Sequence, residues 1–328
     1  MSTILVTGGA GYIGSHVVLQ LRERGERVIV LDNLSRGFRQ AVRDTPLAVG
    51  DAGDRELVAR LLREHAVDTV LHFAAFTIVP ESAREPLKYY ANNTCATRNL
   101  LACCAEAGVA NFVFSSTAAV YGIPPGGYAE EDSPTVPINP YGTSKLMSEW
   151  MLRDLAAVSP LRYVALRYFN VAGSDTGGRI GQSTPKATLL VKVACEAIVG
   201  KRPHLSIFGT DYPTPDGTGV RDYIHVEDLA TAHLDALAYL RAGGASTVLN
   251  CGYGHGYSVR QVLESVQRVA GRALTIREEP RREGDPPTLL ARADRIRSVL
   301  GWHPRLDDLD TIVRTSLAWE QQQLRAPW

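Results

Sequence analysis

The chain has 328 residues, 45% of them hydrophobic, which is enough for a packed core in one large domain or two ordinary ones and argues against disorder. Its 35 basic and 35 acidic side chains balance, so composition gives no electrostatic case for nucleic acid or an anionic membrane as a partner. No apolar run spans a membrane, no signal segment precedes the first predicted strand, and the five cysteines form no C-x-x-C pair, so we expect buried, reduced thiols and a cytoplasmic location.

The first predicted element is a strand over residues 4–7, which ends in a glycine-rich turn. Three glycines, Gly9, Gly11 and Gly14, satisfy G-x-G-x-x-G, and Gly8 gives a second register with the last two. An amphipathic helix follows and stops at Gly25. Glycines between a strand and a helix permit a tight turn and close approach of the backbone to a pyrophosphate, so the stretch predicts a dinucleotide site.

A second strand over residues 28–32 ends in Asp32, about twenty residues after the glycines. A carboxylate there accepts hydrogen bonds from the ribose hydroxyls and repels a 2′-phosphate. We therefore predict NAD as the cofactor, in preference to NADP.

Strands and helices then alternate along the first half of the chain. Strands are predicted at 47–51, 69–73, 112–115 and 163–168, with helices around 57–62, 86–107 and 141–158. This order predicts an α/β fold, a doubly wound parallel-sheet Rossmann domain with ligands at the carboxyl ends of the strands. Asp32, Asp51, Ala74 and Ser115 all fall at such ends.

Beyond Asn170 the alternation breaks, and glycine, proline and polar residues dominate 173–185 and 209–219. A strand at 248–251 is expected to return to the first sheet, with helices near 259–266 and at 309–324. We expect an NAD-binding domain at 1–170, to which the chain returns around 220–255. Residues 171–328 should form mostly a smaller, irregular α/β domain for the substrate.

Tyr141 and Lys145 form a Tyr-x-x-x-Lys pair at a predicted helix start, so their side chains share one helix face. An ammonium beside a phenol lowers the phenol's pKa, and a tyrosine tuned in this way can act as a general base. Thr117, after the fifth strand, can hydrogen-bond a substrate hydroxyl or the phenol. No His, Asp or Glu cluster has the spacing of a metal site.

With these motifs the chain resembles the extended short-chain dehydrogenase/reductase superfamily and, within it, the UDP-glucose 4-epimerases. The narrower resemblance rests on Tyr12-Ile-Gly-Ser-His16, Asp32-Asn-Leu34, Tyr168-Phe-Asn170, the block from Asp211 to Val226, and Pro280-Arg-Arg-Glu-Gly-Asp285. It runs from about residue 3 to residue 320 and implies reversible C4 epimerisation of UDP-glucose and UDP-galactose through a 4-keto intermediate, with tightly bound NAD. A homodimer is the expected assembly.

The resemblance also implies roles for individual residues. Tyr141 would be the base, Lys145 would hold the nicotinamide ribose, and Thr117 would assist proton transfer. The residues expected around NAD are Gly8, Gly11, Tyr12, Ile13, Gly14, Asp32, Asn33, Asp51, Ala52, Phe73, Ala74, Ala75, Asn92, Ser115, Tyr141, Lys145 and Tyr168. Those expected around the UDP-sugar are Thr117, Tyr141, Asn170, Ile207, Phe208, Arg221, Arg282, Asp285 and Leu289, the last beside the sugar 2-substituent.

Two positions depart from the family pattern: Thr77 stands where a lysine near the NAD phosphates is frequent, and Leu189 where a histidine or asparagine is common. Two other functions would require different residues. A nucleotide-sugar 4,6-dehydratase would carry acids after Thr117, where this chain has Ala118 and Ala119. An NAD-sensing binding module would lack the Tyr141 and Lys145 pair.

Overall fold

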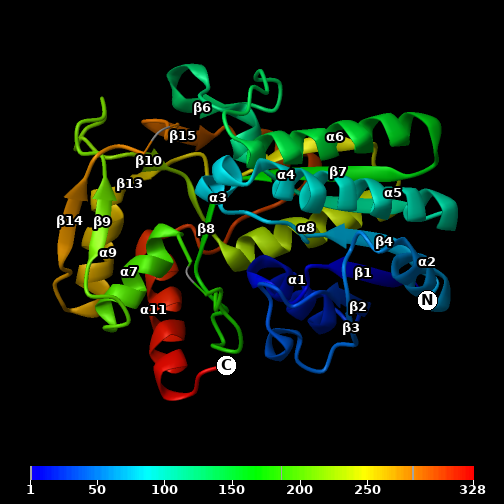
Figure 1. Cartoon of the computed structure of the whole chain (residues 1–328), viewed down its shortest axis with the longest axis horizontal. Helices are drawn as coiled ribbons and strands as arrows, with labels where there is room; N and C mark the ends of the chain where they lie inside the picture. Colours follow the sequence, from blue (N-terminus) through cyan, green and yellow to red (C-terminus); the bar gives the residue numbers. More distant parts are fainter. Residues whose placement is uncertain (1, 186, 283) are drawn as a thin grey trace.

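The computed structural model describes residues 2–185, 187–282 and 284–328, and at its centre lies a parallel sheet of seven strands in the order β12-β7-β5-β4-β1-β2-β3 (Figure 1). The predicted doubly wound α/β fold is confirmed. Its strands are β1 (Thr3–Thr7), β2 (Arg27–Asp32), β3 (Leu47–Val49), β4 (Val67–His72), β5 (Asn111–Thr117), β7 (Arg162–Tyr168) and β12 (Thr247–Cys251).

Successive side chains of each strand point to opposite faces of the sheet, and both faces are buried. Ile4 and Val6 of β1 join the core on one face, while Leu5 joins the core on the other. The first face is covered by α1 (Tyr12–Glu23) and α8 (Val226–Arg241), and the second by α2 (Arg55–Glu64), α5 (Ala96–Ala107) and α6 (Pro140–Val158). Because the strands are parallel, their carboxyl ends all lie along one edge of the sheet.

The helical stretch predicted from about residue 86 to 107 is continuous, as expected, but it is not α-helical throughout. It is divided into α4 (Pro86–Tyr89), a π-helical segment η2 (Tyr90–Cys95) and α5, and a short helix α3 (Val79–Arg84) precedes it. The side-chain hydroxyl of Thr97 donates to the carbonyl oxygen of Asn93 at 2.5 Å, and the side-chain amide of Asn93 donates to Oγ of Ser144 in α6 at 3.0 Å. The first bond satisfies a backbone acceptor inside the wide π-helical turn, and the second ties this turn to α6.

The strands past β7, together with β6 from the segment before it, form three small sheets, with orders β13-β10-β15-β6, β11-β8 and β14-β9. Helices α7, α9 and α11 pack against one another beside them (Figure 1). The elements are β6 (Tyr128–Ala129), β8 (Asn170–Ala172), α7 (Leu190–Ile198), β9 (Leu205–Phe208), β10 (Val220–Arg221), β11 (Tyr223–His225), β13 (Tyr257–Ser258), α9 (Val259–Ala270), β14 (Ile276–Glu279), β15 (Thr288–Ala291), α10 (Asp294–Leu300) and α11 (Leu309–Arg325).

The strand expected to return to the first sheet does so as β12, which pairs in parallel with β7 so that Val248 lies opposite Ala165. The division of the chain at residue 170 stays a prediction. The cysteines are unpaired thiols, but Cys95 is exposed, contrary to the expectation that all five are buried. Within the described ranges, none of the helices is long and apolar enough to cross a bilayer.

Candidate active site

The glycine turn has the geometry that its sequence predicts. Gly8 adopts a left-handed φ of 71°, and a Cβ there would lie 2.5 Å from the backbone nitrogen of Ala74. A Cβ on Gly14 would lie 2.3 Å from the carbonyl oxygen of Gly8, so α1 sits directly against the turn. The helix begins after Gly11 without a side-chain cap. Its first N–H groups are therefore left for an anion, as a pyrophosphate requires.

Asp32 is held at the end of β2 by two backbone N–H groups. Its Oδ2 accepts from Ala10 at 3.0 Å and its Oδ1 from Leu34 at 2.8 Å. Burial raises the pKa of the carboxyl, and these hydrogen bonds oppose the rise. Each oxygen still has a free lone-pair direction, so the side chain can accept from a ribose hydroxyl pair.

Ten of the residues predicted around NAD line one cleft at this edge of the sheet: Gly8, Gly11, Asp32, Asn33, Asp51, Ala52, Phe73, Ala74, Ala75 and Asn92. Asn33 donates to Asp51 at 3.2 Å, which joins the ends of two neighbouring strands. Asn92 reaches the cleft from the π-helical segment. A cleft bounded by a glycine cradle and a ribose acceptor fits a dinucleotide.

Three other predicted residues, Tyr12, Ile13 and Gly14, lie in the first turn of α1 outside the lining of this cleft. The hydroxyl of Tyr12 donates to the carbonyl oxygen of Gly173 at 2.6 Å. The side chain of Tyr12 therefore ties the first helix to the second half of the chain. A contact of these residues with NAD stays a prediction.

Thr117, Tyr141 and Lys145 come together where β5 ends and α6 begins. The side chain of Asn139 caps α6 by accepting from Gly142 at 2.9 Å, and Pro140 occupies the first turn. Tyr141 and Lys145 follow one turn apart, and the side chains of Thr117, Tyr141 and Lys145 are all buried. Burial raises the pKa of the Tyr141 phenol, and the side chain of Thr117 opposes this rise.

Lys145 makes no hydrogen bond to Tyr141 among the described residues, and the predicted tuning of Tyr141 by Lys145 stays a prediction. Burial raises the pKa of Tyr141, and the group that opposes the rise is Thr117. Lys145 instead donates from Nζ to the carbonyl oxygen of Ser115 at 2.7 Å and lies 4.8 Å from the ring centre of Phe114. Burial lowers the pKa of Lys145 to about 7, against the attraction of Glu149. The ammonium is fixed by the strand end and not by the phenol.

The two remaining predicted cofactor residues, Ser115 and Tyr168, hydrogen-bond each other through their side-chain oxygens. They stand on the adjacent strands β5 and β7. Burial also raises the pKa of Tyr168 well above its usual range. The pair thus places two neutral hydroxyls near Tyr141. A negative charge on Tyr141 would raise the pKa of Tyr168 further.

A buried ion pair between Arg167 and Glu149, which was not predicted from the sequence, lies behind these residues. Arg167 donates from Nη2 to Oε2 of Glu149 at 2.6 Å, and Ser116 donates to Oε1 of the same carboxylate at 2.5 Å. Glu149 lies one turn after Lys145 on the same face of α6. The regular spacing of Tyr141, Lys145 and Glu149 indicates that Glu149 shares their helix face. That Arg167 of β7 pairs with Glu149 follows only from the three-dimensional structure.

The residues predicted for the substrate lie partly on the sheet β13-β10-β15-β6. Arg221 of β10 is the register partner of Leu289 in β15, and its Nη2 donates to Asp285 at 2.5 Å. Strand β15 also pairs with β6, in the segment that leads from Thr117 to Tyr141. The small sheet therefore joins Arg221 and Leu289 to the segment that leads to Tyr141.

A second group of predicted substrate residues surrounds the end of β9. The guanidinium carbon of Arg282 lies 3.7 Å from the ring centre of Phe208, a cation–π contact. Ile207 is fully buried in the core, so its side chain is not free to line a site. Asn170 is half-buried at the start of β8, and its N–H donates to Asp222 at 3.0 Å. Leu189 immediately precedes α7 and does not cap it.

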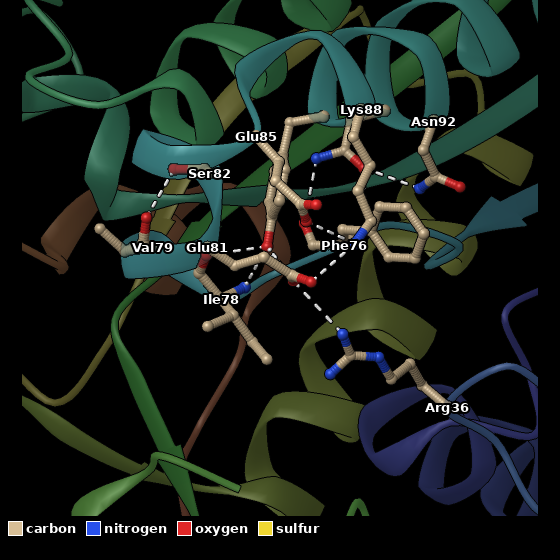
Figure 2. Close-up of polar contacts among 11 residues, drawn as sticks. Arg36, Phe76, Ile78, Val79, Glu81, Ser82, Glu85, Lys88 and Asn92 are labelled. Carbon is tan, nitrogen blue, oxygen red and sulfur yellow. Dashed lines mark hydrogen bonds and ion pairs between the residues drawn. The ribbon is translucent and has the colours of Figure 1, made fainter. Parts of the chain in front are cut away.

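Figure 2 shows a further group of charges, missed by the sequence analysis, at the rim of the cofactor cleft. Arg36 lines that cleft with Phe76 and Asn92, and its guanidinium lies 3.3 Å from Glu81 of α3. The carboxylate of Glu81 also accepts from Lys88 at 2.8 Å and from the hydroxyl of Tyr89 at 2.9 Å. The sequence signal for this group was Arg36, a basic residue four positions after the predicted ribose acceptor Asp32.

The comparisons with known proteins agree with this geometry. The profile of the family described as NAD dependent epimerase/dehydratase matches residues 4–252. The chain belongs to this family. Because its description names NAD, it accords with the cofactor expected from Asp32.

Individual members of the family narrow the resemblance. A UDP-glucose 4-epimerase of Azospirillum brasilense is 57% identical over 319 residues, which cover 97% of this chain and 92% of the relative. The crystal structure of the UDP-glucose 4-epimerase from Brucella ovis in complex with NAD superimposes with a TM-score of 0.94 at 42% identity, covering 97% and 98%. The UDP-Glc/GlcNAc 4-epimerase of Campylobacter jejuni gives 0.86 at 47% identity, covering 98% and 100%. The resemblance inferred from the motifs is confirmed.

Proposed function

We propose that this chain interconverts UDP-glucose and UDP-galactose by reversible epimerisation at C4, with tightly bound NAD. The observation that carries the proposal is the convergence of Thr117, Tyr141 and Lys145 at the strand edge that also holds the glycine turn. Membership of the epimerase/dehydratase family and the named relatives support it.

Tyr141 is the base in this proposal. Its phenolate oxygen accepts the proton of the sugar 4-hydroxyl as the C4–H bond breaks, and a 4-keto sugar results. NAD, when bound, supplies the acceptor and later the donor of the C4 hydride. Once the ketone presents its other face, Tyr141 returns the proton to the oxygen. No net redox change occurs, so the cofactor can remain in place.

Two buried groups of the chain support this base. Thr117 opposes the rise that burial causes in the pKa of Tyr141 and so favours the phenolate. Lys145, fixed on the carbonyl oxygen of Ser115, offers its other N–H groups to the nicotinamide ribose. We assign the residues lining the cleft to NAD, together with Tyr12, Ile13, Gly14, Ser115 and Tyr168.

The substrate is assigned to the second half of the chain. Arg221 and Arg282 supply guanidinium groups suited to the UDP pyrophosphate. Asn170, Ile207, Phe208, Asp285 and Leu289 complete that assignment, Ile207 through its backbone because its side chain is in the core. A dehydratase would need an acid after Thr117, but Ala118 and Ala119 supply none.

We also propose a cytoplasmic homodimer. The packed helices α4 and α6 expose apolar side chains, among them Leu87 and Trp150, which are 79% and 45% exposed. A second copy of the chain would cover them. Light scattering of the purified protein measures this directly, and a monomer at micromolar concentration would contradict the dimer.

The activity is tested by incubating the purified protein with UDP-galactose, without added cofactor, and separating the products. UDP-glucose should form until both sugars are present at equilibrium. The matched control is Tyr141→Phe, in which kcat should fall by roughly two to four decades because the base is lost. Failure of a folded, NAD-containing sample to form UDP-glucose would refute the proposal.

A further inference from the structure

The cofactor cleft carries an unbalanced set of charges. Two carboxylates, Asp32 and Asp51, line it, and among the described residues of its lining Arg36 alone carries a positive charge. A dinucleotide brings two more negative charges with its pyrophosphate. Since like charges in a half-enclosed cleft repel one another, the position of Arg36 decides where an anion is best accommodated.

Arg36 belongs to a loop that packs against the glycine turn. The N–H of Phe38 donates to the carbonyl oxygen of Ala10 at 3.0 Å. A Cβ on Gly37 would lie 2.8 Å from the backbone carbon of Ala10, so the two segments are in direct contact. Arg36 therefore projects from the immediate neighbourhood of the turn that precedes α1.

The contact of Arg36 with Glu81 shows the direction in which its side chain runs. Arg36 follows β2, whereas Glu81 lies in α3 after β4, and β1 stands between these two strands in the sheet. The ion pair thus joins segments on the two sides of the strand that carries the glycine turn (Figure 2). A pyrophosphate on the N-terminus of α1 would lie beneath this connection.

Only one nitrogen of the Arg36 guanidinium has a partner among the described residues. Its contact with Glu81 is 3.3 Å long and involves Nη2, while the side chain remains 37% exposed. Glu81 has closer partners in Lys88 and Tyr89, so its charge does not depend on Arg36. Within the described ranges Nε and Nη1 of Arg36 make no hydrogen bond. They can therefore serve a phosphate in the bidentate geometry that guanidinium groups favour.

We propose that Arg36 binds the pyrophosphate of the dinucleotide, and that Glu81 positions its guanidinium above the glycine turn. The inference rests on the proposed function in that NAD is the cofactor. Thr77, which follows the lining residue Phe76 in sequence, is uncharged, so Arg36 is the cation that the described lining of the cleft offers to the phosphates.

The test compares two ligands in the full-length protein depleted of NAD, with folding checked by circular dichroism. ADP-ribose contains the pyrophosphate and adenosine does not. By calorimetry, Arg36→Ala should bind ADP-ribose about ten- to a hundredfold more weakly, the usual loss for a charge-assisted hydrogen bond, and adenosine as wild type does. Arg36→Lys should recover part of the loss, because it keeps the charge but not the fork.

The matched control is Arg39→Ala, which removes the same charge from an exposed position in the same segment, outside the cleft lining. Its affinity for both ligands should equal that of wild type. Unchanged binding of ADP-ribose by Arg36→Ala, or an equal loss for adenosine, would overturn the inference while leaving the proposed function intact. Wild-type protein that does not bind NAD would contradict the proposed function instead.

Discussion

Lys145 of α6 donates a hydrogen bond from its ammonium to the carbonyl oxygen of Ser115 in β5, at 2.7 Å. The bond fastens the helix that carries Tyr141 to the strand that ends in Thr117. Thr117 in turn opposes the rise that burial causes in the pKa of the Tyr141 phenol. Lys145 is thus an amine with a fixed position at the strand edge, and burial lowers its own pKa to about 7.

Removing the hydroxyl of Thr117 should move the pH dependence of the reaction. Thr117 opposes the rise that burial causes in the pKa of Tyr141, and the proposed base acts as the phenolate, so Thr117→Val should raise the pH at which kcat increases. Thr117→Ser keeps the hydroxyl and serves as the control. Profiles of kcat against pH for the three proteins check this, and coincident profiles would show that Thr117 does not tune the base.

The lowered pKa of Lys145 predicts a change of stability with pH. The unfolded lysine holds its proton up to about pH 10.4, whereas the folded one loses it near 7. The unfolded state therefore binds more protons between these values, and the free energy of unfolding should rise with pH, by about 2 kcal/mol from pH 7 to pH 9. Lys145→Met should lack this increment. Urea unfolding of both NAD-free proteins measures the difference, and parallel pH dependences would contradict the lowered pKa.

Asp32 should control both retention and choice of the cofactor. Asp32→Ala removes the acceptor for the ribose hydroxyls and the charge that repels a 2′-phosphate. The variant should lose NAD during purification and discriminate less between NAD and NADP. Cofactor content and the two dissociation constants test this, with Asp44→Ala, a change of the same charge in an exposed part of the following loop, as the control. Identical selectivity in Asp32→Ala and wild type would refute the assignment.

Leu289 should set the range of sugars. It is the register partner of Arg221 and is half-buried, and it packs partly against the main core. The buried Pro286 and the bond from Val220 N–H to Pro287 at 2.8 Å limit its retreat. We expect main activity on the plain hexoses and weak activity on UDP-N-acetylglucosamine. Leu289→Ser should raise the N-acetyl activity and Leu289→Tyr abolish it; an unchanged ratio of kcat/KM in both variants would place the side chain in the core instead.

Local pattern was sufficient for the parts of the molecule that are local in sequence. The glycine turn, the strand ending at Asp32 and the start of α6 at Tyr141 each depend on residues a few positions apart, and all three formed as predicted. The returning strand β12 was found from its apolar run. Ligand roles of the site residues stay predictions, because they concern molecules outside the chain.

The features that sequence missed depend on distant partners. The π-helical segment is tied to α6 by the bond from the Asn93 amide to the Ser144 hydroxyl, and the buried pair of Glu149 and Arg167 joins a helix to a strand. Arg36 becomes notable only because the fold brings Glu81 opposite it. Charge and helical periodicity along the chain contain no information on which of many such residues meet.

The measurement that tests the central claim most directly uses UDP-galactose with deuterium at C4 and the purified protein without added cofactor. If the C4 hydride leaves and returns to the same carbon, the UDP-glucose formed should keep the deuterium at C4, and none should pass into water. Formation of UDP-glucose with protium at C4, or the absence of any product, would contradict the account.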